Sequence, residues 1–211
     1  MFELSQFYFF AGAALALLLV PGPAVLYIVA RSMNQGHLAG LVSVLGIQTA
    51  TLAHVVAAAL GLSAILVSSA LAFDIVKYLG AAYLIYLGVR KLLAREEQQE
   101  SGVSKKESLL RVYAQGVVVN LLNPKTALFF FAFLPQFVNT VKGDVTLQIL
   151  LLGIFFTLMA MVTDGTYALL ASSVAHRLKD NLRFLRTQRY FTGVVYVGLG
   201  VTTALSGSSK K

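Results

Sequence analysis

Long stretches of apolar residues alternate with short polar segments along the chain. A helix needs about 20 apolar residues to cross a bilayer core about 30 Å thick. Six stretches are long enough: Leu4–Val29, Ala39–Ser63, Leu71–Leu92, Val112–Val138, Thr146–Ser172 and Tyr190–Ser206. The pattern predicts an all-α, polytopic membrane protein with six transmembrane helices. The second and third stretches are nearly continuous around Ser68 and Ser69, so hydropathy alone leaves a five-span count open.

The composition supports a protein that lies in lipid. Of the 211 residues, 57% are hydrophobic and 12% are charged, whereas soluble domains carry about 25% charged residues. Such hydrophobicity excludes an intrinsically disordered chain. The chain has no cysteine, which excludes disulfides, thiolate metal sites and thiol redox chemistry.

The positive charge is concentrated on one side of the predicted bundle. With six spans, the loops on that side carry 12 lysines and arginines, and the opposite side carries 4. The positive-inside rule then places the loop Arg90–Arg111 in the cytoplasm and both termini outside. The same rule accounts for the net charge of +8, so we predict no nucleic-acid partner. Because the loop also holds glutamates such as Glu107, we expect it to be solvated.

Proline residues interrupt the first and fourth stretches at matching places. Leu18–Val25 can be laid over Leu121–Leu128 at an offset of 103 residues, which aligns Pro21 with Pro124. Broken helices at corresponding places in two halves are typical of transporter repeats. We therefore predict two inverted three-helix halves, about 1–93 and 112–206, joined by a cytoplasmic linker at about 94–111 within a single transporter domain. Two unrelated helix kinks are the alternative.

Two charged residues, Lys125 and Asp164, lie within predicted spans. Each ionised side chain costs about 2.5–3.5 kcal/mol near the bilayer centre, so we expect both to face the bundle interior. There they could bind a substrate or carry a proton. The alternatives are a purely structural ion pair and a lysine that extends to the membrane surface.

Further polar and small residues lie near the two breaks. Asn120 and Asn123 precede Pro124, and their amides could bind freed carbonyls or a ligand. Each helix that restarts after a break offers free N–H groups that suit a carboxylate, and Gly22 permits close approach of a ligand. His54 could relay a proton or simply pack.

Small residues along the second span form a ridge: Gly46, Ala50, Ala57 and Gly61. Such a ridge predicts tight helix packing, either within the chain or in a homo-oligomer.

Four motifs, in the order given next, resemble those of the LysE/RhtB superfamily of bacterial amino-acid exporters. The motifs are Pro21-Gly22-Pro23, GAAYLIYLG at 80–88, NLLNPK at 120–125 and LPQF at 134–137. The resemblance is closest to the homoserine/threonine/leucine branch of that superfamily. The resemblance covers most of the chain and is weakest after Ser173. It implies export of a neutral or related amino acid across the bacterial inner membrane by proton antiport. Asp164 with Tyr167 resembles the aspartate–aromatic pattern of the family's fifth span.

These observations together predict a secondary amino-acid exporter, not an enzyme, with no cofactor and no metal. Its partners are the amino acid, protons and the lipid bilayer. The predicted substrate-binding residues are Pro21, Gly22, Pro23, Asn120, Asn123, Pro124 and Lys125. Asp164 and His54 are predicted to couple protons or to meet the substrate ammonium. An ion or metal effluxer of the same superfamily and a non-transport membrane scaffold are the alternatives.

Overall fold

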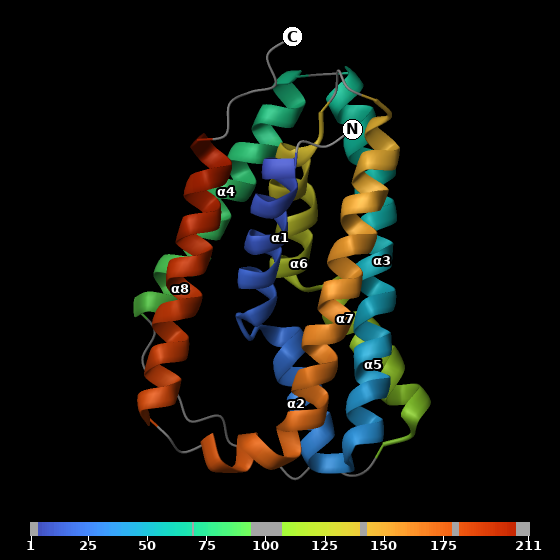
Figure 1. The fold of residues 1–211 in the computed structure, drawn as a ribbon, viewed down its shortest axis with the longest axis vertical. Coiled ribbons are helices and arrows are strands. Elements are labelled where there is room, and N and C mark those ends of the chain that lie inside the picture. Colours follow the sequence, from blue (N-terminus) through green and yellow to red (C-terminus); the bar gives the residue numbers. More distant parts are fainter. Residues whose placement is uncertain (1–3, 69, 94–106, 140–142, 179–181, 206–211) are drawn as a thin grey trace.

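The computed structural model describes the chain apart from residues 1–3, 69, 94–106, 140–142, 179–181 and 206–211. Every regular element in the described residues is helical (Figure 1). The elements are α1 (Leu4–Leu19), α2 (Pro23–Gln35), α3 (His37–Ser68), α4 (Ala70–Leu93), α5 (Leu109–Leu121), α6 (Pro124–Leu128), the π-helical η1 (Phe129–Phe133), the 3₁₀-helical η2 (Leu134–Phe137), α7 (Val145–Leu178) and α8 (Leu182–Leu205).

Each of the six predicted stretches coincides with one of these helices or with a broken pair. Two helical segments, His37–Gly61 and Val145–Ala171, are long and apolar enough to cross a membrane unaided. The described residues give up to four spans if α1–α2 and α5–η2 each count as one bent span. The chain is therefore an all-α, polytopic membrane protein. The full count of six spans stays a prediction. In that count α4 and α8 would be the third and sixth spans.

The helices of the two predicted halves run in opposite directions (Figure 1). In that view α1–α2 descends, α3 ascends and α4 descends, whereas α5–α6 ascends, α7 descends and α8 ascends. Because α3 and α4 are antiparallel, the apolar stretch around Ser68 forms two helices. Both broken pairs also bend by 49°. These are features that an inverted repeat requires, and the repeat itself stays a prediction.

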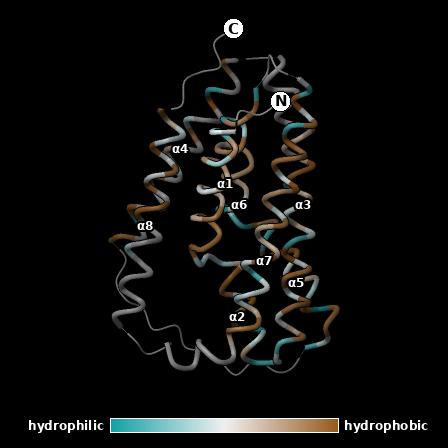
Figure 2. Tube along the Cα trace, in the orientation of Figure 1, coloured by the Kyte–Doolittle hydropathy of each residue, from teal (hydrophilic) through white to brown (hydrophobic). Residues whose placement is uncertain are grey.

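A phenylalanine cluster fills the space between α1, η1, η2 and α7. Phe10, Phe129 and Phe133 are at most 1% exposed, and the rings of Phe129 and Phe156 stack with centroids 4.4 Å apart. Hydrophobic residues dominate α3 and α7 in Figure 2, whereas hydrophilic positions interrupt the trace beside the α6 label, in the middle of the bundle. The polar centre is therefore enclosed by an apolar shell.

The small-residue ridge packs at only one of its ends. A side chain at Gly46 would place its Cβ 2.2 Å from the carbonyl oxygen of Tyr113, so the backbones of α3 and α5 are in direct contact there. Ala57 is exposed, and a Cβ at Gly61 would meet nothing within 4 Å. Tight packing within the chain is confirmed at Gly46 and is not seen at Gly61, where packing in a homo-oligomer stays a prediction.

Much of the predicted cytoplasmic linker, residues 94–106, lies outside the described residues. Residues 108–111 are described and exposed, and the expectation that the loop as a whole is solvated stays a prediction. Glu107 is partly buried. Its carboxylate forms an ion pair with Arg31, and only 20% of its side chain is exposed.

Candidate functional site

The break in the first helix results from two prolines with a glycine between them. Proline lacks an N–H and clashes with the preceding turn, so α1 ends at Leu19 and α2 begins at Pro23. Gly22 is the N-cap of α2, and no side chain caps that terminus. The first N–H groups of α2 thus lack a partner within their own helix.

The break in the fourth helix has its own cap. Asn123 precedes Pro124, and its Oδ1 accepts a hydrogen bond from the backbone N–H of Lys125 at 3.1 Å. Asparagine is a favoured N-cap because its short side chain reaches the first turn. The restart of the chain as α6 is therefore encoded locally by Asn123 and Pro124.

Side chains from other helices satisfy the carbonyls that the prolines leave free. A proline at position i frees the carbonyl at i−4, so Pro23 frees Leu19 and Pro124 frees Asn120. The hydroxyl of Tyr167 donates to the Leu19 oxygen at 3.0 Å. Nε2 of His54 lies 3.1 Å from the Asn120 oxygen, and because a carbonyl only accepts, His54 donates.

Lys125 joins the two breaks. Its ammonium nitrogen donates to the carbonyl oxygen of Val20, at the end of α1, over 2.5 Å. This contact shows that the two breaks meet. Val20 is fully buried and Lys125 is 8% exposed, so the lysine lies in the bundle interior and does not reach for a membrane surface.

Lys125 and Asp164 do not form the direct ion pair that the sequence left open. No ion pair within 4.0 Å joins these two described residues. Instead, Oδ2 of Asp164 accepts a hydrogen bond from Nε2 of Gln48 at 2.8 Å. Each buried charge therefore has a neutral hydrogen-bond partner.

Asn120 uses the full hydrogen-bonding capacity of its side chain within the protein. Its Nδ2 donates to the Ile47 carbonyl at 3.0 Å and to the Thr51 hydroxyl at 2.9 Å. Its Oδ1 accepts from Asn123 Nδ2 at 3.1 Å and from the Thr126 hydroxyl at 2.9 Å. An asparagine amide offers two N–H groups and two lone pairs. Asn120 therefore fixes the break against α3 and keeps nothing for a ligand.

A small cavity lies between the two breaks, α3 and α7, with a volume of about 30 Å³. A buried water needs about 10–15 Å³, so the cavity has room for about two or three waters and is too small for an amino acid. Its polar lining residues are Gln48, Thr51, Asn120, Asn123, Lys125, Thr126 and Asp164.

The predicted site residues fall into two groups. Gly22, Asn120, Asn123, Lys125 and Asp164 line the cavity. Four others do not: Pro21, Pro23, Pro124 and His54. The prolines shape the backbone of the breaks, and the His54 ring packs beside Phe130, with centroids 6.3 Å apart.

Sequence reasoning gave no role to three polar residues that line the cavity. Gln48 and Thr51 are three residues apart and therefore share one face of α3. Thr126 follows Lys125 directly. Gln48 and Thr51 are polar residues on an apolar helix, and this pattern in the sequence could have predicted that they line a polar site. In the described part of the chain, no group of three or more histidine, aspartate or glutamate residues is placed to hold a metal ion.

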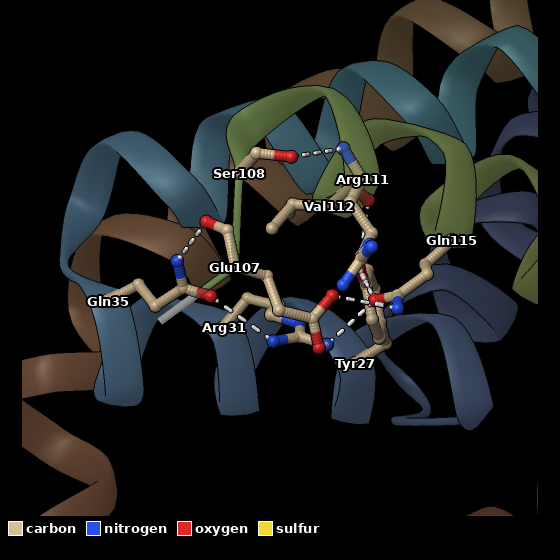
Figure 3. Close-up of polar contacts among 8 residues, drawn as sticks. All are labelled: Tyr27, Arg31, Gln35, Glu107, Ser108, Arg111, Val112 and Gln115. Atoms are coloured by element: carbon tan, nitrogen blue, oxygen red, sulfur yellow. Dashed lines mark hydrogen bonds and ion pairs between the residues drawn. The ribbon is translucent and has the colours of Figure 1, made fainter. Parts of the chain in front are cut away.

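A second polar cluster, the Arg31 network, joins α2 to α5 and to the residues just before it (Figure 3). It consists of Tyr27, Arg31, Gln35, Glu107 and Gln115. Nη2 of Arg31 donates to Glu107 at 3.0 Å and to Gln115 at 2.7 Å. Gln35 Nε2 donates to the Glu107 carbonyl at 2.8 Å, and Gln115 Nε2 donates to the Glu107 carboxylate at 2.9 Å. The network holds the end of α2 that lies away from the cavity.

The chain resembles known proteins over nearly its whole length. Residues 15–207 match the family described as LysE type translocator. The chain is 34% identical to the homoserine/homoserine lactone efflux protein of Salmonella typhimurium, over 88% of this chain and 89% of that protein. It is 32% identical to the uncharacterized membrane protein YrhP of Bacillus subtilis, over 92% and 95% of the two chains.

A leucine efflux protein of an Enterobacter species is 24% identical over 96% of this chain and 97% of its own length. No solved structure matches the chain. The similarity therefore extends across both broken helices and the cavity between them.

Proposed function

Because the chain belongs to the LysE type translocator family, we propose that it is a secondary active exporter of neutral amino acids that uses proton antiport. It is a multi-pass protein of the bacterial inner membrane. Relatives that bear the names of homoserine and leucine efflux proteins support this substrate class.

One observation carries the proposal: two opposite buried charges line the same cavity without pairing with each other. Lys125 is 8% exposed and Asp164 is 4% exposed. A buried charge is costly unless it is paired. An amino-acid zwitterion supplies the complement of both, since its carboxylate suits Lys125 and its ammonium suits Asp164.

Free donors beside Lys125 support the carboxylate end. Lys125 gives one of its three ammonium N–H groups to Val20. Asn123 gives one amide N–H to Asn120 and keeps the other. Ala24 and Val25, in the uncapped first turn of α2, also line the cavity. Lys125, Asn123 and this helix terminus together form the carboxylate subsite.

Asp164 couples the substrate to protons in this scheme. One carboxylate that binds either a proton or an ammonium, but not both, exchanges them across the membrane when the site opens alternately to each side. His54 is a positioning residue here, because its Nε2 proton is held by the Asn120 carbonyl at 3.1 Å. Asn120 and the prolines are likewise positioning residues.

Uptake into inside-out vesicles with an acidic lumen, which corresponds to export from the cell, tests the proposal. Labelled L-homoserine and L-leucine are the substrates, and the variants are Lys125→Ala and Asp164→Asn. We expect both to lower the export rate at least tenfold, since a hydrogen bond to a charged group contributes about 1.5–3 kcal/mol. Asp144→Asn is the matched control, because Asp144 caps the start of α7 and is exposed.

Unchanged export in both variants, at equal protein abundance, would contradict the site. The wild type could also fail to transport either amino acid while a deletion strain is sensitive to metals. That result would instead support an ion or metal effluxer.

A further inference from the structure

We propose that Gln48 is a second acceptor for the substrate ammonium, so that Gln48 Oε1 and the Asp164 carboxylate together recognise a primary ammonium group. This inference rests on the proposed function and adds a residue to which no binding role has been given. Gln48 is 2% exposed and lines the cavity. Its Oε1 is buried and has no hydrogen-bond partner among the described residues.

The orientation of the Gln48 amide is fixed by its neighbour. Nε2 lies 2.8 Å from Oδ2 of Asp164. With Asp164 ionised, the form that binds an ammonium, rotating the amide by 180° would set an oxygen against a carboxylate oxygen, which is two acceptors without a proton between them. The amide oxygen is therefore the atom of this amide that does not bond Asp164, and it remains an acceptor.

The donors of Thr51, Asn120 and Thr126, which line the cavity near Gln48 on α3 or at the fourth-helix break, are committed elsewhere. The Thr51 hydroxyl donates to the Ile47 carbonyl at 3.1 Å. Both N–H groups of the Asn120 amide are used, and the Thr126 hydroxyl donates to Asn120. A buried acceptor without a donor is rare in folded proteins, and such an atom calls for a water or a ligand.

An acceptor next to a carboxylate selects a particular chemistry. The carboxylate favours a cation, and the two oxygen acceptors require at least two N–H groups on it. A primary ammonium has three N–H groups and satisfies both acceptors. A tertiary ammonium has the same charge but one N–H, so it satisfies only one. The pair therefore selects free α-amino groups over N-alkylated ones at equal charge.

Competition experiments with Gln48→Leu test this pair. Export of labelled L-leucine is competed by unlabelled L-leucine and by N,N-dimethyl-L-leucine, which retains the charge and loses two N–H groups. We expect the half-saturating leucine concentration to rise about tenfold in Gln48→Leu. We also expect the preference for leucine over its dimethyl analogue to shrink about tenfold, because one of the two acceptors is gone.

Two further variants separate binding from folding. Gln48→Glu keeps an acceptor oxygen and can share a proton with Asp164, so we expect acidic pH to restore part of its preference for leucine. Gln136→Leu makes the same amide-to-leucine change away from the cavity, where Nε2 bonds the Ala132 carbonyl at 3.0 Å. We expect Gln136→Leu to keep the wild-type preference. An unchanged preference in Gln48→Leu overturns the inference, since Oε1 then meets only water.

Failure of the proposed function gives a different result. If the wild type exports neither leucine nor homoserine, that function is wrong, and thermal stabilisation of the purified protein decides the inference. n-Butylammonium should then stabilise the wild type more than N,N-dimethylbutylammonium does, and Gln48→Leu should abolish the difference. If n-butylammonium stabilises the wild type no more than N,N-dimethylbutylammonium does, the acceptor pair is overturned.

Discussion

The ammonium nitrogen of Lys125 lies 2.5 Å from the carbonyl oxygen of Val20, which is 105 residues earlier in the chain. One side chain therefore satisfies a backbone acceptor at one break and presents charge beside the other. These two roles can be separated, because the first needs only an N–H group and the second needs a positive charge.

Lys125→Gln keeps a donor that can approach Val20 and removes the charge. We expect its abundance in the membrane to stay near that of the wild type while export of leucine falls at least tenfold, as the loss of a charge-assisted hydrogen bond implies. Lys125→Met removes both roles, so we expect lower abundance as well as lost export. Wild-type export by Lys125→Gln would remove the charge from the mechanism.

Tyr167→Phe leaves the Leu19 carbonyl without its donor. Pro23 leaves the Leu19 carbonyl without its helical N–H partner, and the Tyr167 hydroxyl lies 3.0 Å from that carbonyl oxygen. An unsatisfied acceptor costs about 1–3 kcal/mol, which lowers the unfolding midpoint by about 2–4 °C per kcal/mol in a chain of this size. Thermal unfolding in detergent measures the shift. Tyr8→Phe is the matched control, because Tyr8 is 65% exposed, and its midpoint should not move.

Gly46→Ala should push α3 away from α5. Its Cβ would lie 2.2 Å from the Tyr113 carbonyl oxygen, and a backbone atom in a packed helix cannot move aside cheaply. Overpacking of this kind costs about 1–3 kcal/mol. Gly61→Ala is the control on the same helix, where a Cβ meets nothing within 4 Å, and the better helix propensity of alanine should make it neutral or slightly stabilising. Equal resistance of the two variants to denaturant would contradict the close contact.

The features that sequence predicted well depend on local chemistry. Hydropathy and proline sterics placed the helices and both breaks, and the cost of a charge in lipid placed Lys125 and Asp164 inside. Partner choice depends on the register in which α3 packs against α5, which no local pattern encodes. That register saturates Asn120 and directs His54 to a backbone carbonyl. In the same way, the packing of α3 against α7 makes Gln48, and not Lys125, the hydrogen-bond partner of Asp164.

Arg31 and Glu107 give a last prediction, about access to the cavity. Arg31 lies on α2, beyond the break at Pro21–Pro23, so α2 can move while α1 stays in place. The ion pair, 3.0 Å long with side chains 12% and 20% exposed, holds this segment to the chain at the start of α5. We expect Glu107→Gln to open the cavity toward the side predicted to be cytoplasmic.

The absence of native cysteine makes this opening measurable. Val25 lines the cavity and is 4% exposed, so Val25→Cys should react slowly with a membrane-impermeant maleimide in inside-out vesicles. Adding Glu107→Gln should raise the labelling rate about threefold to tenfold, the change expected when about 1 kcal/mol of restraint is lost from a partly buried pair. Asp144→Asn removes the carboxylate that caps the start of α7, and α7 starts at the end of the bundle opposite the start of α5 (Figure 1). This variant should leave the rate unchanged.

The charge-swapped double variant Arg31→Glu, Glu107→Arg separates the ion pair from the identity of its residues. If the pair restrains α2, the swap should return labelling of Val25→Cys toward the slow rate, because the attraction is restored while every other contact of the cavity is kept. Fast labelling in the swap together with slow labelling in Glu107→Gln alone would show that the pair does not control access. The restraint would then lie in the hydrogen bond from Arg31 Nη2 to Gln115 at 2.7 Å, which Glu107→Gln keeps and the swap removes.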